Sequence, residues 1–120
     1  MKKIILAGLM LLTMTTLHAE SKKKIYSMTI DIADKKANGK SWDMFGGPPD
    51  IKVVIDGQVY FSAVKCQDTY RCTIEFISTT DKWYIEVYDK DIQSDDLVGK
   101  GDCSVGKKYS LGLAEVEISD

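Results

Sequence analysis

The sequence predicts an all-β protein, an antiparallel sandwich built as a single domain. Apolar and polar residues alternate with a period of two in several short runs, and no run keeps the 3.6-residue period of an amphipathic helix. Turn-forming residues separate these runs along about a hundred residues. Together, the alternation, the short spacing and the frequent turns favour a β-sandwich over a helical or mixed fold.

Seven runs of the chain have the composition of strands. They cover residues 24–34, 51–55, 58–64, 72–78, 83–89, 101–105 and 113–119. Asp56 and Gly57 separate the second run from the third, and this dipeptide is typical of a two-residue hairpin turn. Residues 34–49 and 89–101 form longer connections. Connections of this length in a compact domain are often functional.

The first 19 residues have the pattern of a secretory signal peptide. Lys2 and Lys3 precede a mostly apolar stretch, and Ala19 offers a small residue at the expected cleavage point. A spanning helix needs about 20 apolar residues, whereas this stretch is shorter and contains three threonines. We therefore predict a signal peptide over residues 1–19, one domain over residues 20–120, and a periplasmic or secreted location.

Export excludes several function classes. The only histidine, His18, precedes the cleavage point, so the exported chain has no imidazole for acid–base catalysis or zinc binding. Without Lys2 and Lys3, the 14 basic and 18 acidic side chains give a net charge of −4. Nucleic-acid binding requires a basic surface, so no nucleic-acid partner is expected. A small sandwich also offers little room for a substrate pocket, and we expect a protein that is not an enzyme.

Three cysteines in an exported chain indicate at least one disulfide. Cys66 and Cys72 flank the connection between two predicted strands, and we predict a bridge between them. Pairing of Cys103 with either of them is the alternative. A zinc site is disfavoured, because the cysteines form no CxxC pair and lack a fourth ligand.

An acidic cluster follows the predicted strand 83–89. Four aspartates fall within eight residues, and carboxylates at this density repel one another unless a cation is present; they are Asp89, Asp91, Asp95 and Asp96. Oxygen ligands on a flexible loop suit calcium. An EF-hand does not fit, because Ser94 and Lys100 stand where that loop needs glycine and glutamate. The alternative is a solubilising turn.

Two segments of the chain resemble the loops of C2 domains. VYDKDIQSDDLVGKG (87–101) is similar to the third C2 loop, and WDMFGGPPDIKVVI (42–55) is similar to the first. The resemblance implies an eight-stranded antiparallel β-sandwich in which these loops meet at one end and bind Ca2+. Carried over by position, it implies five metal ligands, namely Asp43, Asp50, Asp89, Asp91 and Asp96.

The two loops differ from common C2 members in length. The first loop is one residue longer between its aspartates, and the third is one residue shorter. The number of calcium ions is therefore left open, with Asp34 and Asp95 as alternative ligands. In C2 domains that dock on membranes, apolar loop tips insert among lipids. For Met44, Phe45 and Ile92 we favour packing against Trp42, because three residues make a small patch.

The resemblance implies a calcium-dependent binding module. Its expected partners are anionic phospholipid headgroups or an envelope protein. The alternative is a non-catalytic structural or adaptor protein of the cell envelope that uses the sandwich for protein contacts, with calcium absent or only stabilising.

Overall fold

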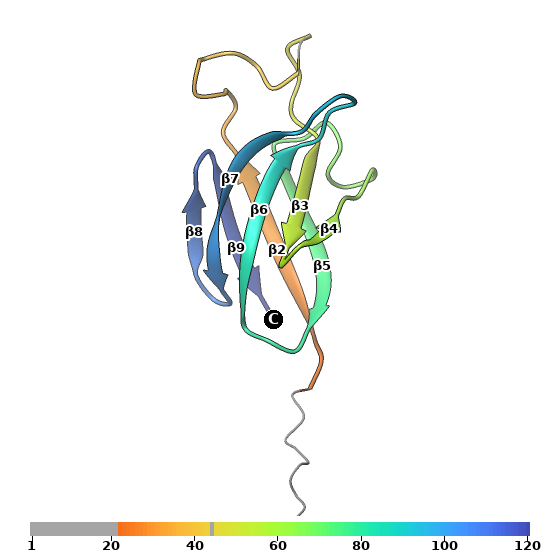
Figure 1. Ribbon diagram of the computed structural model, residues 1–120, viewed down its shortest axis with the longest axis vertical. Helices are drawn as coiled ribbons and strands as arrows, with labels where there is room; N and C mark the ends of the chain where they lie inside the picture. The colour runs from red at the N-terminus through yellow and green to blue at the C-terminus, as the bar shows by residue number, and fades with distance from the viewer. Residues whose placement is uncertain (1–21, 44) are drawn as a thin grey trace, which may run out of the picture.

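The computed structural model describes residues 22–43 and 45–120, which form eight strands in two four-stranded antiparallel sheets (Figure 1). One sheet has the order β5–β2–β9–β8, with β5 (Arg71–Ser78), β2 (Lys24–Ile32), β9 (Ala114–Ser119) and β8 (Lys108–Leu111). The other has the order β4–β3–β6–β7, with β4 (Gln58–Tyr60), β3 (Ile51–Ile55), β6 (Lys82–Asp89) and β7 (Asp96–Ser104). The predicted eight-stranded all-β sandwich is confirmed. The predicted signal peptide lies outside the described residues.

The core lies between the two sheets, where the alternating apolar residues of the strands meet. Tyr26 of β2, Phe76 of β5 and Trp83 of β6 form an aromatic cluster, with ring centroids 4.8 Å apart for Tyr26–Trp83 and 5.2 Å for Phe76–Trp83. This burial of alternate residues is what holds the two sheets together. No helix within the described residues is long and apolar enough to span a membrane.

The hairpin predicted at Asp56-Gly57 is confirmed, but the strand after it is shorter than expected. Both turn residues have positive φ, 48° at Asp56 and 86° at Gly57, as the two-residue turn requires. β4 ends at Tyr60. The chain then turns, and the Cys66 N–H donates to the Ser62 carbonyl oxygen at 2.8 Å.

Two strand boundaries in the C-terminal part also differ from the prediction. β7 begins at Asp96 and not at residue 101, so the second long connection shortens to residues 90–95. The β6–β7 register shifts between Val87 and Tyr88, and this bulge leaves both Val98 and Gly99 buried. The short strand β8 was not predicted, because Lys108–Leu111 has only one inward-facing apolar residue, Leu111.

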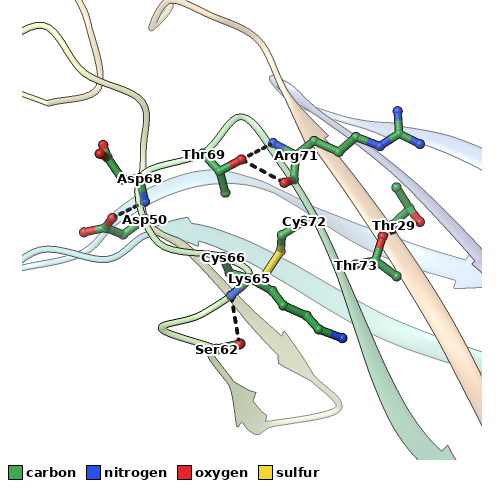
Figure 2. Close-up of a disulfide and its surroundings, with 10 residues drawn as sticks. All are labelled: Thr29, Asp50, Ser62, Lys65, Cys66, Asp68, Thr69, Arg71, Cys72 and Thr73. Carbon is green, nitrogen blue, oxygen red and sulfur yellow. Dashed lines mark hydrogen bonds between the residues drawn. A yellow bond between two sulfur atoms is a disulfide. The ribbon is translucent and has the colours of Figure 1, made fainter.

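The predicted Cys66–Cys72 disulfide is confirmed, and the alternative pairing through Cys103 is excluded (Figure 2). The two Cα atoms are 5.0 Å apart. Cys103 is a free thiol buried between the sheets, and burial raises its pKa to about 11. A thiol with so high a pKa is scarcely ionised near neutral pH, so Cys103 is an inert core residue.

Three connections lie together at one end of the sandwich (Figure 1). We call them the first loop (residues 33–50, between β2 and β3), the disulfide loop (residues 61–70, between β4 and β5) and the third loop (residues 90–95, between β6 and β7). The antiparallel strand order brings them together, because β2, β4 and β6 all run toward this end.

Candidate functional site

A cavity of about 540 Å³ opens between the first and third loops. All five predicted ligand residues line it: Asp43, Asp50, Asp89, Asp91 and Asp96. Lys36, Lys40 and Lys90 contribute basic groups to the same lining. The cavity is larger than we expected of so small a sandwich. It brings together two acidic segments that are about 40 residues apart in the sequence.

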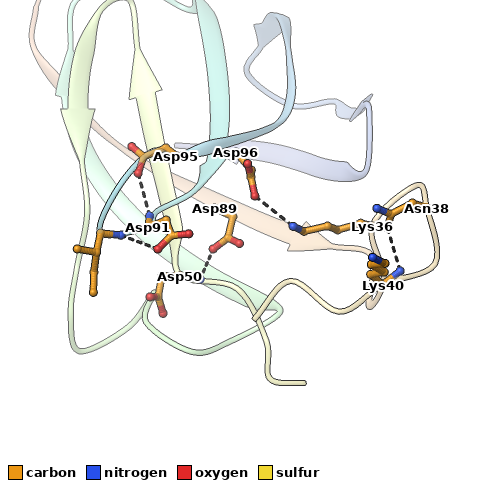
Figure 3. A network of polar contacts seen from close by, with 9 residues as sticks. Lys36, Asn38, Lys40, Asp50, Asp89, Asp91, Asp95 and Asp96 are labelled. Carbon is orange, nitrogen blue, oxygen red and sulfur yellow. Dashed lines mark hydrogen bonds and ion pairs between the residues drawn. The ribbon is translucent and has the colours of Figure 1, made fainter. Parts of the chain in front are cut away.

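Asp89 is the buried carboxylate of this cavity. It continues the inward alternation of Trp83, Ile85 and Val87 along β6, and it is only 8% exposed. One of its oxygens, Oδ1, accepts a hydrogen bond from the Asp50 backbone N–H at 3.0 Å (Figure 3). Its other oxygen has no hydrogen-bond donor among the described residues. An anionic oxygen without a partner in a buried position is unusual in a folded protein.

The surroundings of Asp89 favour its neutral form. Burial is the largest cause, and it raises the pKa to about 6 from 3.8. The hydrogen bond from Asp50 N–H and the charge of Lys36 lower the pKa, whereas the charges of Asp50 and Asp96 raise it. Asp96 lies directly opposite Asp89 in the β6–β7 register, and like charges in such a pair destabilise a sheet. This part of the cavity therefore has an excess of negative charge.

The first loop holds Asp43 and Asp50 at its end. Asp43 begins a tight turn in which its N–H donates to Gly47 O at 3.2 Å and Gly46 N–H donates to Asp43 O at 2.9 Å. Gly46 has a φ of 92°, a conformation that favours glycine. Asp50 is fixed against the start of the third loop, because its carbonyl accepts the Lys90 N–H at 2.7 Å.

The third loop is organised by its own aspartates. The Asp91 N–H donates to Asp95 Oδ1 at 2.9 Å, and the Ile92 N–H donates to Asp91 Oδ1 at 2.6 Å (Figure 3). Asp95 also forms an ion pair with Lys52 of β3, and this hydrogen bond lowers the pKa of Asp95. Asp95, an alternative ligand in the sequence analysis, is therefore engaged on the Lys52 side and does not line the cavity.

A lysine already neutralises part of the acidic site. Lys36 Nζ lies 3.2 Å from Asp96 Oδ2, and it also lies 5.9 Å from the centre of the Trp42 ring. Within residues 22–43 and 45–120, no three acidic or cysteine side chains are arranged so that they could hold one metal ion as they lie. The five aspartates thus share a cavity, but in this conformation their carboxylates do not converge on one point.

Asp68 of the disulfide loop is a sixth acidic residue at this end, and the sequence analysis missed it. Its N–H donates to Asp50 Oδ1 at 2.7 Å. A Cβ added at Gly47 would lie 3.3 Å from Asp43 Oδ2 and 3.4 Å from Asp68 Oδ1, so these two carboxylates face one another across Gly47. The predicted strand order contained the clue, because the connection 61–70 leaves the sandwich at the same end as the other two loops.

Each of the three loops carries an exposed apolar residue. Phe45 is 92% exposed, Val64 92% and Ile92 99%. The expectation that Phe45 and Ile92 pack against Trp42 is therefore wrong. Trp42 instead turns inward, is itself buried, and donates its indole N–H to Ala33 O at 2.7 Å. Met44, named with them, lies outside the described residues.

The fold and the site together define an antiparallel β-sandwich with an acidic cavity at its loop end. A solved structure of Extended-Synaptotagmin 2 that contains two of its C2 domains, A and B, is similar in fold, with a TM-score of 0.48 and 12% sequence identity over 97% of this chain. The match covers 46% of that chain, so this protein spans slightly under half of its length. No protein-family model and no curated protein sequence matches the chain.

Proposed function

We propose that this protein is an exported, non-catalytic calcium-binding module whose loop end docks on anionic lipid. The observation that carries the proposal is Asp89, a buried carboxylate with one oxygen lacking a partner among the described residues and two further aspartates beside it. A divalent cation in the cavity would relieve this repulsion. Calcium suits the donor set, because every candidate ligand is a hard carboxylate oxygen.

The proposed ligands come from both loops. Asp50 and Asp89 are held in place by backbone hydrogen bonds, whereas Asp43 and Asp91 lie on exposed turns. Binding would therefore require the exposed carboxylates to turn toward the two fixed ones. The disulfide supports the proposed export, because disulfides persist in oxidising compartments such as the periplasm and the extracellular medium.

Lipid docking is supported by the exposed residues around the cavity. Phe45, Val64 and Ile92 project from three loops, and Lys40 and Lys90 lie among them. When bound, calcium would supply positive charge that attracts anionic headgroups to the cavity. The three apolar side chains would then enter the headgroup region, where burying apolar area is favourable.

Calcium is expected to raise the melting temperature of the exported chain. At 100 times the dissociation constant, a ligand that binds only the folded state stabilises it by about 2.7 kcal/mol. A domain of this size should then melt roughly 10 °C higher. Thermal melts with chelator and with millimolar calcium, joined to calorimetric titration, measure the effect. Identical melts in the two conditions would exclude the calcium site.

Liposome co-sedimentation tests the docking step separately. We expect the protein to pellet with vesicles of anionic phospholipid in calcium and to remain in the supernatant with chelator or with neutral vesicles. A protein that binds calcium but never pellets would point to a protein partner at the same loops.

One observation favours the second candidate, a calcium-independent envelope adaptor. Lys36 pairs with Asp96, and Lys52 pairs with Asp95, so the chain supplies cations of its own to this end. Under the calcium proposal, the amino group of Lys36 competes with the metal ion for Asp96. Under the adaptor function, the lysine is a permanent partner of this aspartate.

Replacement of Lys36 separates these two functions. We expect Lys36→Met to tighten calcium binding about fivefold, because a competing positive charge near the carboxylates is removed. Lys40→Met is the matched control, since Lys40 lines the same cavity and has no ion pair among the described residues. Calorimetric titration measures both variants. Equal affinities of Lys36→Met and the unmodified protein would show that Lys36 does not compete with calcium.

A further inference from the structure

The disulfide loop is bound tightly to the segment that carries Asp50. Three hydrogen bonds join the two segments, from Ile51 N–H to Cys66 O (2.7 Å), from Asp68 N–H to Asp50 Oδ1 (2.7 Å) and from Thr69 N–H to Pro49 O (2.9 Å). They engage three consecutive residues, 49 to 51, at the point where the first loop enters β3. Figure 2 shows Asp68 above Asp50, beside the disulfide.

The disulfide holds the donors of these bonds in place. Cys66 is fully buried and Cys72 is 3% exposed, so the bridge anchors both ends of the segment in the core. Between them, Asp68 has a φ of 57°, a left-handed conformation that is uncommon for a residue other than glycine. A short closed segment has few alternative conformations, which keeps the Asp68 N–H directed at Asp50.

The side chain of Asp68 faces the acidic cavity from a third direction. Its Oδ1 and Asp43 Oδ2 both lie within 3.4 Å of the position that a Cβ on Gly47 would occupy. Both carboxylates thus approach the same small space. On the far side of Asp50, the buried Asp89 has an oxygen without a donor among the described residues. That oxygen is independent of the disulfide loop, and it points to a missing positive ligand.

We propose that the disulfide loop forms a third side of the cation site, in which Asp68 is a ligand residue and the Cys66–Cys72 bridge positions Asp50. This inference rests on the calcium-binding function proposed above. It adds a carboxylate from outside the first and third loops, and it gives the disulfide a role in affinity as well as in stability.

The test compares three variants of the exported chain by calorimetric titration with calcium. Asp68→Asn removes the charge but keeps the size and tolerates the left-handed backbone, and we expect it to weaken calcium binding about tenfold. Asp56→Asn is the matched control, because Asp56 also has positive φ and lies at the other end of β3. We expect it to bind calcium as tightly as the unmodified protein does.

The third variant, Cys66→Ala/Cys72→Ala, tests the positioning of Asp50. We expect weaker calcium binding, measured well below its melting temperature, with unchanged far-ultraviolet circular dichroism. Should this variant not fold, Asp68→Asn alone decides, since Asp68 is exposed. An unmodified protein that binds calcium together with an Asp68→Asn variant of equal affinity overturns this inference alone. An unmodified protein that binds no calcium overturns the proposed function and this inference with it.

Discussion

Asp89→Asn is expected to stabilise the calcium-free protein at pH 7.5 and to abolish its stabilisation by calcium. Ionised Asp89 is unfavourable in the fold, because burial raises its pKa to about 6 from 3.8. That difference corresponds to about 3 kcal/mol at a pH above both values. The buried amide of asparagine loses part of this gain, so we expect a net stabilisation of about 1 to 2 kcal/mol, or roughly 5 to 10 °C in Tm.

The pH dependence of this effect has a defined sign. A carboxyl whose pKa is raised by folding binds its proton more tightly in the native state than in the unfolded state. Its contribution to stability is therefore fully present below pH 3.8 and is lost as the pH rises through about 6. The Tm advantage of Asp89→Asn should accordingly be largest at pH 7.5 and should shrink toward pH 4.5. Thermal melts in chelator across this range measure it.

Calcium should reverse the order of the two proteins. The native chain gains stability from the ion, whereas Asp89→Asn has lost the carboxylate at the centre of the site. Asp95→Asn is the control, because Asp95 pairs with Lys52 outside the cavity lining. It should keep the calcium response. A calcium-dependent rise in Tm that persists in Asp89→Asn would contradict the assignment of Asp89 as a ligand.

The sequence predicted the position of Asp89 better than its surroundings. Alternation along Trp83, Ile85 and Val87 places residue 89 on the inward face, so its burial follows from the period of a strand. The Asp56-Gly57 turn was predictable for a similar reason, since few dipeptides tolerate two positive φ values. Local patterns of this kind need no knowledge of the partners across the sheet.

Features that depend on contacts between distant segments were not predictable. Lys36 and Asp96 are 60 residues apart, and nothing in either local sequence indicates that they pair. The same holds for Asp68, whose proximity to Asp43 and Asp50 follows from the packing of the disulfide loop on residues 49–51. The outward direction of Phe45 and Ile92 likewise depends on Trp42, which fills the space beneath the first loop.

Gly99→Ala is expected to destabilise the fold severely. A Cβ at Gly99 would lie 1.7 Å from the Leu111 carbonyl oxygen and 3.0 Å from the Gly112 backbone nitrogen. Neither atom can move aside by a side-chain rotation, so the turn between β8 and β9 would have to shift. We expect a loss of about 4 kcal/mol, enough to lower Tm by more than about 15 °C.

The close approach at Gly99 has a structural cause in the sandwich. The β8–β9 turn lies directly against the bulge in β7, where Leu113 N–H donates to Val98 O at 3.2 Å. Gly112, in the same turn, has a φ of 60°, and a Cβ there would lie 2.4 Å from Val98 O. Glycine is thus needed on both sides of this contact between the two sheets. In the sequence alone, Gly99 is only the last residue of a loop motif.

Gly101→Ala, two residues along the same strand, is the matched control. The nearest atom to its added Cβ is Leu111 Cδ2 at 2.8 Å, the end of a side chain that can rotate away. We expect a loss of about 1 kcal/mol. Thermal and urea melts of the two variants measure the difference. If both variants melt within a few degrees of each other, the β7–turn contact is not what joins the two sheets at this end. The position of Asp96 would then be fixed by its pairing with Asp89 on β6 alone.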